Sequence, residues 1–276
     1  MKKLYLIPLF LLLPCLCFSQ TDSLRRKVIG WQFSIPFEVG LGYYLPKNHP
    51  ATSEFGHLLN TRKTVGTRIQ IGSFQLQLHD RFFIELAFNF DNIGFKEGSA
   101  LKELQEHNPD YFIQGRSKYG QSEGAAEGSY VNNRRYLRLG AGYNILLKPL
   151  DYLKPYAAAD LGNALLPASK YGFKEYSSNH FFTKEYSYGK LKCYGFNTGI
   201  CFSHYLLSDD RKTFALWGLK LEYSNITVKG TGKITQSDLY LPATESFVPV
   251  KENFQYISLG VFMGFSSGKD KPLTGK

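Results

Sequence analysis

The chain has 276 residues, of which 43% are hydrophobic and 20% charged, and this ordinary balance excludes a disordered protein. Aromatic residues are unusually frequent at 16%, and lysine plus arginine outnumber aspartate plus glutamate by 33 to 23, a formal net charge of +10. Beyond the N-terminus no apolar run reaches the roughly 18 residues that a membrane-spanning helix needs, which excludes a helical membrane protein.

The N-terminus has the pattern of a secretory signal peptide. Lys2 and Lys3 precede an apolar stretch over residues 4–16, which is too short to span a bilayer, and Ser19 supplies a small residue for cleavage. We expect the mature chain to start near Gln20. Because the chain is exported, no nucleic acid partner is expected although the chain is basic.

A lipoprotein signal is the alternative, because Cys15 and Cys17 lie at the end of the same stretch. The residues before these cysteines are Pro14 and Leu16, whereas a lipoprotein signal has a small residue at that position. We therefore favour cleavage without lipidation.

From residue 32 onward, apolar side chains alternate with polar or small ones, which is the period-two pattern of a β-strand. The first segment can cross roughly 30 Å of hydrocarbon at a tilt of about 40°, whereas strands of soluble proteins are most often about 5–6 residues long. In the second segment the phase changes at Gly72 and Ser73, which predicts a β-bulge. The eight segments are residues 32–44, 65–78, 82–90, 137–147, 153–162, 193–202, 215–223 and 256–265.

The connections between these segments alternate in length. Those after the first, third, fifth and seventh segments have about 20, 45, 30 and 30 residues, and the others are short turns. This predicts an all-β fold: an eight-stranded antiparallel up-and-down transmembrane β-barrel with short periplasmic turns and long extracellular loops. A soluble eight-stranded barrel is the alternative, but such a barrel turns its apolar face inward around a ligand.

The face opposite the apolar one carries the glycines of the segments and equal numbers of acidic and basic residues. Small residues allow an eight-stranded barrel to close on a narrow interior, and buried charges must be paired. We therefore predict an interior ion-pair network that plugs the barrel, so that it is not an open channel. The expected members are Glu38, Arg68, Glu85, Arg138, Lys154, Asp160, Lys220 and Glu222.

The last segment resembles the C-terminal insertion signal of Gram-negative outer-membrane proteins, on the residues Ser258, Gly260, Met263 and Phe265. With the export signal and the alternating segments, the chain resembles the small outer-membrane β-barrels of the OmpA membrane-domain, OmpX and OmpW type, within the broad outer membrane protein beta-barrel or porin-like family. The resemblance implies a location in the cell outer membrane, contact with lipid and lipopolysaccharide, and insertion by the barrel-assembly machinery. It divides the chain into a signal peptide (1–19), a periplasmic N-terminal segment (20–30), the outer-membrane barrel (31–265) and a periplasmic C-terminal tail (266–276).

Two of the long connections have features of their own. In the second, the sequence predicts a short helix that is capped by Ser99 and stops before Pro109. In the third, residues 163–192, lysines mix with aromatic residues; these either contact lipopolysaccharide or a protein partner, or form the interfacial aromatic belt of the barrel. The residues concerned are Lys170, Lys174, Lys184, Lys190, Lys192, Tyr171, Phe173, Tyr176, Phe181, Phe182, Tyr186 and Tyr188.

No catalytic, cofactor or metal site is predicted, and we expect a monomer that is not an enzyme. Ser203 and His204 are neighbours, so on a strand they point to opposite faces and cannot form a catalytic pair. His49, Glu54 and His57 lie in the first long connection without a spacing typical of a metal site. The expected role is structural or in recognition through the surface loops. The alternatives are a narrow channel for a small solute, an accessory barrel of a secretion or assembly machine and, less favoured, a lipid A-modifying enzyme.

Overall fold

The computed structural model describes residues 32–44, 65–78, 82–115, 129–148, 151–165, 168–178, 180–189, 191–207, 213–238 and 240–268. The expected signal peptide and N-terminal segment lie outside these ranges. The elements are β1 (Gln32–Tyr44), β2 (Val65–Leu78), β3 (Phe82–Lys96), α3 (Glu97–His107), β4 (Tyr111–Gly115), β5 (Ser129–Tyr143), β6 (Ile145–Lys148), β7 (Asp151–Leu165), β8 (Ser169–Glu175), β9 (Phe181–Tyr188), β10 (Leu191–Leu207), β11 (Thr213–Asp238) and β12 (Thr244–Gly268).

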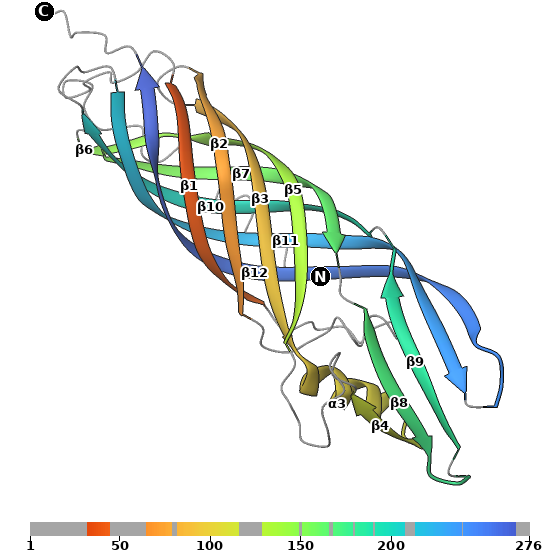
Figure 1. The fold of residues 1–276 in the computed structure, drawn as a ribbon. Helices are drawn as coiled ribbons and strands as arrows, with labels where there is room; N and C mark the ends of the chain where they lie inside the picture. The colour runs from red at the N-terminus through yellow and green to blue at the C-terminus, as the bar shows by residue number, and fades with distance from the viewer. Residues whose placement is uncertain are drawn as a thin grey trace, which may run out of the picture.

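The strands form one antiparallel sheet of twelve, and eight of them close into a ring (Figure 1). Around the ring the order is β1, β2, β3, β5, β7, β10, β11 and β12, and β12 pairs back onto β1. The sequence predicted eight strands. β4, β8 and β9 are additional to that prediction, and the predicted segment 137–147 is divided between β5 and β6. The three additional strands are short, from 5 to 8 residues, and such lengths do not give a sustained period-two pattern.

β2 contains the irregularity that its sequence predicted. The pairing of β2 with β3 shifts register between Gln70 and Ser73, and Gly72 has a φ of 76°. This φ is the left-handed conformation that glycine adopts without a steric penalty. The predicted bulge at Gly72 is therefore confirmed, and it returns the apolar side chains of β2 to the outer face.

Two strands continue far beyond the ring. β11 and β12 have 26 and 25 residues, against 13 for β1. Beyond the ring they pair with each other, and β11 also pairs with β9. β8 and β4 continue this sheet, and Figure 1 shows α3 beside them. We call this part, made of residues 97–115, 169–178, 180–188, 224–238 and 240–255, the extension. The expected long loops after the fifth and seventh segments are therefore wrong over these residues, because much of them is paired strand.

The extension has a hydrophobic core of its own. Leu104 of α3 is fully buried in it, and Tyr171, Phe173, Phe182 and Tyr186 of the third connection are buried around it. These four rings therefore belong to the core, and neither the lipid-belt nor the ligand-contact interpretation holds for them. α3 begins two residues before Ser99, so the predicted cap at that residue is wrong, whereas the helix does end before Pro109.

The outer wall of the ring is apolar. On β12 alternate residues over 257–265 are exposed hydrophobics, from 43% for Ile257 to 74% for Phe265. Towards the extension the outward side chains of the same strand become polar, at Gln255 and Asn253. The apolar wall thus ends where the strand leaves the ring. β12 also runs to Gly268, so residues 266–268 of the expected tail are part of the strand. Within the described ranges, no helix is long and apolar enough to cross a membrane.

Candidate functional site in the barrel interior

The inward side chains of the ring strands meet around one carboxylate. Glu222 of β11 is 1% exposed and accepts hydrogen bonds from Arg138 at 2.7 and 2.9 Å and from the Tyr156 hydroxyl at 2.5 Å. Arg68 of β2 also donates to Glu222, and the Lys220 ammonium lies 3.6 Å away. β2 and β5 are not neighbours of β11 in the ring, so these contacts cross the interior.

The space that these contacts need depends on glycine. Tyr156 lies against Gly199 of β10, where an added Cβ would come within 2.6 Å of the tyrosine hydroxyl and of a backbone oxygen. A larger residue at Gly199 would therefore displace Tyr156 from Glu222. The glycines on the inward face thus allow large side chains from other strands to fill a narrow interior.

Each arginine also binds a second carboxylate. Arg138 donates to Asp160 at 2.9 and 3.2 Å, and Asp160 in turn accepts from the Asn197 amide at 2.7 Å. Arg68 donates to Asp91 through Nε at 2.9 Å. Both arginines are at most 2% exposed, and each one bridges two acids, so no guanidinium is left without a counter-charge.

Asp91 marks the side of the network nearest the extension. The hydroxyls of Tyr136 and Tyr256 each donate to it at 3.0 Å, and Arg134 lies 3.8 Å away. The Arg68 guanidinium lies 4.9 Å from the centroid of the Tyr256 ring, a cation–π contact. Tyr256 also belongs to the core of the extension, so the ionic network and that core are in direct contact.

The network includes every strand of the ring. Lys220 connects it to β1 through Glu38 at 2.8 Å. One member from each ring strand, in chain order, is Glu38, Arg68, Asp91, Arg138, Asp160, Asn197, Glu222 and Tyr256.

All eight residues that the sequence placed in the network are buried. Six of them are joined through Glu222, as described. The other two contact neutral groups: Glu85 accepts from the Gln70 amide at 3.3 Å, and Lys154 donates to the Tyr205 hydroxyl at 2.5 Å.

Several members of the network were missed from the sequence. Asp91, Arg134, Tyr136 and Tyr256 lie at or beyond the ends of the predicted segments. Their positions continue the inward phase, since Asp91 follows Asn89 by two residues and Arg134 precedes Arg138 by four. The inward phase could have identified them, but the segments were ended where the outward residues stop being apolar.

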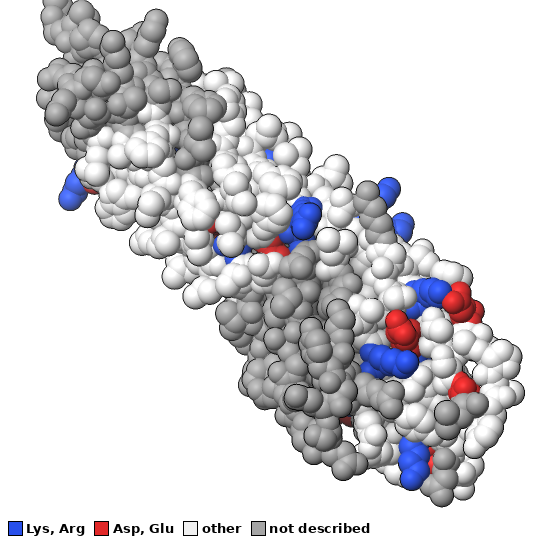
Figure 2. All heavy atoms as spheres, viewed as in Figure 1, with Lys and Arg blue, Asp and Glu red and all other residues white. Residues whose placement is uncertain are grey.

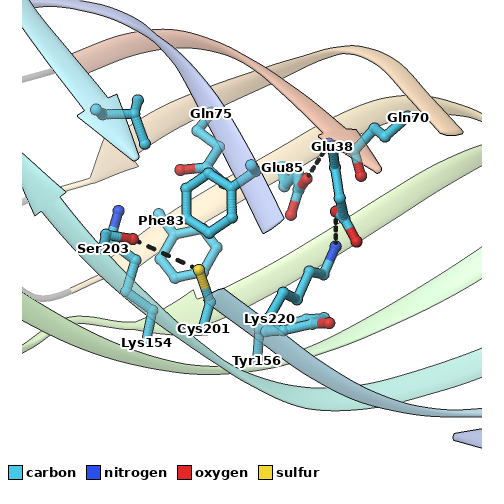
Figure 3. Close-up of a pocket in the computed structure, with 12 residues that line it drawn as sticks. Glu38, Gln70, Gln75, Phe83, Glu85, Lys154, Tyr156, Cys201, Ser203 and Lys220 are labelled. Atoms are coloured by element: carbon cyan, nitrogen blue, oxygen red, sulfur yellow. Dashed lines mark hydrogen bonds and ion pairs between the residues drawn. The ribbon is translucent and has the colours of Figure 1, made fainter. Parts of the chain in front are cut away.

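A cavity lies on the side of the network towards the short connections, and Figure 3 shows the residues that line it. Lys154 and Ser203 are near the ends of their strands at those connections, and Phe262 and Leu216 line the cavity as members of a small apolar cluster with Tyr205. The lining residues are Glu38, Gln70, Gln75, Phe83, Glu85, Lys154, Tyr156, Cys201, Ser203, Leu216, Lys220 and Phe262.

The residues of the predicted insertion signal lie on β12, which closes the ring by pairing with β1 and β11. Ser258 and Gly260 are buried on the inward face, and Met263 and Phe265 are exposed on the outer wall.

The residues considered for other chemistry do not assemble into a site. Ser203 is buried inside the ring, whereas His204 is partly exposed and pairs with Asp151 at 2.5 Å. His49, Glu54 and His57 lie outside the described residues. Within the described ranges, no group of three or more histidine, cysteine or acidic side chains is arranged to hold a metal ion.

Comparisons with known proteins returned likeness in structure only. No family model matches the chain, and no curated protein matches it in sequence. A major outer membrane protein from Thermus thermophilus has a TM-score of 0.38 at 11% identity, over 85% of this chain and 99% of that one. The outer membrane protease OmpT from Escherichia coli has a TM-score of 0.28 at 10% identity, over 91% and 99%. The Pseudomonas putida toluene transporter TodX has a TM-score of 0.23 at 9% identity, over 87% and 90%.

The surface of the ring indicates whether the protein lies in a membrane or in water. A closed ring leaves no strand edge unpaired, and an exposed apolar wall around a charged interior is stable in lipid and not in water. Bacterial β-barrels of this kind are found in the outer membrane. The protein is located in the cell outer membrane. Its ring strands carry the lipid-facing wall, and its extension projects beyond that wall.

Proposed function

We propose that the protein is an eight-stranded outer-membrane barrel with a closed interior that recognises a partner through its extension. In this proposal the short connections and both chain ends are periplasmic, and the extension is extracellular. The barrel works as a monomer, contacts lipid and lipopolysaccharide, and is inserted by the barrel-assembly machinery through the end of β12. It is not an enzyme, and the separation of Ser203 from His204 on opposite faces supports this.

The observation that carries the proposal is the network of side chains from all eight ring strands. An ion moving through the ring would have to pass Glu222, which two arginines and a lysine surround. Opening a path means separating buried ion pairs, and breaking one such pair costs about 3–5 kcal/mol. The buried core of the extension lies directly against the network, since Tyr256 belongs to both.

The extension has the properties of a rigid surface for recognition. At the end of the β11–β12 hairpin, Tyr240, Leu241 and Phe247 are 87%, 66% and 68% exposed. Exposed aromatic and large apolar side chains grouped on a folded support are typical of protein interaction sites. Figure 2 shows that most of the charged atoms on this face lie over the extension, while the barrel wall is mainly uncharged.

Polar contacts fix the turn between β8 and β9. Ser178 donates a hydrogen bond to Glu175, and this bond, with a second from Ser177, lowers the pKa of the Glu175 carboxyl below its ordinary value. His180 pairs with Asp238 of β11 at 2.5 Å. The turn is thus tied to the long hairpin, which supports a preformed surface.

The closed interior is tested by single-channel recording in planar lipid bilayers. Purified full-length protein should give no steady opening at any voltage. A steady, ohmic opening of uniform size would contradict the proposal and favour the narrow channel instead.

Recognition is tested by photo-crosslinking in intact cells. A photoreactive amino acid at Phe247, in the extension, should give a discrete crosslinked product. The same amino acid at Leu259, which is 60% exposed on the lipid-facing wall, is the matched control and should give none. Equal crosslinking at both positions, or none at Phe247, would remove the support for a partner.

A further inference from the structure

The cavity on the short-connection side of the network is lined by two buried charged side chains that form no salt bridge with any residue the structure describes. Lys154 of β7 is 3% exposed and Glu85 of β3 is 4% exposed, and both side chains line the cavity. Among the side chains that the structure describes, no group of opposite charge lies within 4.0 Å of either one. Figure 3 shows Lys154 on one side of the cavity and Glu85 on the other.

The Lys154 end of the cavity is rich in donors. The ammonium has three N–H donors, and its one described hydrogen bond goes to the Tyr205 hydroxyl. The Ser203 hydroxyl lines the same side, and its one partner among the described residues is the weak thiol of Cys201 at 3.5 Å. The ring of Phe83 lies 5.6 Å from the ammonium and gives it no hydrogen bond. An ammonium and a hydroxyl at one end suit a carboxylate.

The Glu85 end is rich in acceptors. A carboxylate offers about four lone-pair positions, and Glu85 has one described donor, the Gln70 amide at the long distance of 3.3 Å. The other amide atom, the Gln70 Oε1, is buried and has no hydrogen-bond partner in the part of the chain that the structure describes. A carboxylate and a carbonyl oxygen at one end suit an ammonium with several N–H groups.

The charges of the cavity balance as a whole. Its two acids are Glu38 and Glu85, and its two bases are Lys154 and Lys220. Lys220 and Glu38 are paired with each other at 2.8 Å, so one charge of each sign remains. A ligand with a single charge would neutralise one of these two groups and leave the other buried and uncompensated, which is costly. A ligand with both charges satisfies both.

We propose that this cavity binds a small zwitterion with a primary ammonium and a carboxylate, the chemistry of an amino acid. The ligand carboxylate binds Lys154 and Ser203, and the ligand ammonium binds Glu85 and the Gln70 Oε1. The proposal goes beyond recognition by the extension and does not depend on it, because the site lies on the opposite side of the ionic network.

The test is calorimetric titration of the purified full-length protein, folded in detergent micelles. The probes are glycine, β-alanine and γ-aminobutyrate, which carry the same two charges at increasing separation. Acetate and methylamine carry one charge each and serve as controls. We expect saturable binding of one amino acid, with an affinity at least tenfold above that of either control, because each end adds a charge-assisted hydrogen bond.

Variants locate the binding. Lys154→Met and Glu85→Gln should each weaken it at least tenfold, whereas Lys148→Met, an exposed lysine on β6, should leave it unchanged. Glu85→Gln keeps the size of the side chain and decides the matter if Lys154→Met does not fold. The absence of saturable binding by all three amino acids overturns the proposal. So does acetate binding as tight as that of the amino acids, or unchanged affinity in folded Glu85→Gln.

Discussion

Replacing Arg138 with methionine removes the guanidinium that joins Asp160 to Glu222 inside the ring. Arg138 is fully buried and makes four contacts of 2.7 to 3.2 Å to the two carboxylates. Glu222 keeps Arg68 and Lys220, whereas the one described partner that Asp160 keeps is the Asn197 amide. Removal of one partner from a buried ion pair costs about 3–5 kcal/mol, because it leaves the other charge buried and uncompensated.

The loss in the free energy of unfolding is measured by urea titration in detergent micelles. Urea is raised to unfold the protein and lowered to refold it, so that the two curves can be compared. The midpoint for Arg138→Met should fall by an amount that corresponds to that free energy. Addition of Asp160→Asn should recover most of the loss, since the stranded carboxylate becomes a neutral amide.

Arg135 provides the matched control on the same strand, because it is exposed on the outer face. Arg135→Met should change the free energy of unfolding by less than about 1 kcal/mol, as expected for an exposed charge. If Arg138→Met and Arg135→Met unfold at the same urea concentration as the unchanged protein, the network does not hold the ring together, and the reasoning fails.

Three further predictions address the wall, the closure of the ring and the extension. Leu259→Arg places a cation on the lipid-facing wall and should cost about 2–4 kcal/mol in folding into lipid vesicles, whereas Gln255→Arg, beyond the wall, should cost under about 1 kcal/mol; equal costs would place the membrane elsewhere. Gly162→Ala puts a Cβ 2.0 Å from a backbone oxygen of β5 and should prevent the ring from closing. A closed barrel that has not been boiled migrates faster in SDS electrophoresis than the unfolded chain, so this fast band should be lost. An unchanged band would contradict this contact. Leu104→Ala opens a cavity in the core of the extension and should cost about 2–5 kcal/mol there. Leu104→Ala should therefore speed proteolysis of the extension, while the ring stays closed and the fast band remains. Leu241→Ala, at an exposed position, should leave both the rate of proteolysis and the fast band unchanged.

The sequence predicted which charged residues face the interior of the ring, but it did not predict which of them form ion pairs with each other. Alternation placed Arg138 and Glu222 on the inward face, because residues two apart on a strand point to the same side. It could not pair them, since they are 84 residues apart and their strands are not neighbours in the ring. Their contact depends on which strands lie opposite each other and on the register of every pair between them, and a one-residue slip would move either side chain to the lipid face.

The extension was missed because the apolar face changes sides along β11. Within the ring the outward residues Leu219 and Leu221 are apolar and face lipid. Beyond it the inward residues Ile226 and Val228 are apolar, and both are fully buried. Period two continues without interruption, so the strand does not end at Tyr223. A change in the apolar phase marks the point where a strand leaves the membrane and enters a protein core.

The sequence alone determined which side chains of the ring strands face lipid and which face inward, because the side-chain period of an extended strand is fixed by its geometry and needs no partner. Only the tertiary structure decided that two strands continue into a packed extension, that Glu222 lies at the centre of the interior network, and that Lys154 and Glu85 line a cavity without a salt bridge to any described residue. These features depend on the closure and register of the ring, which bring residues far apart in the chain within hydrogen-bond distance.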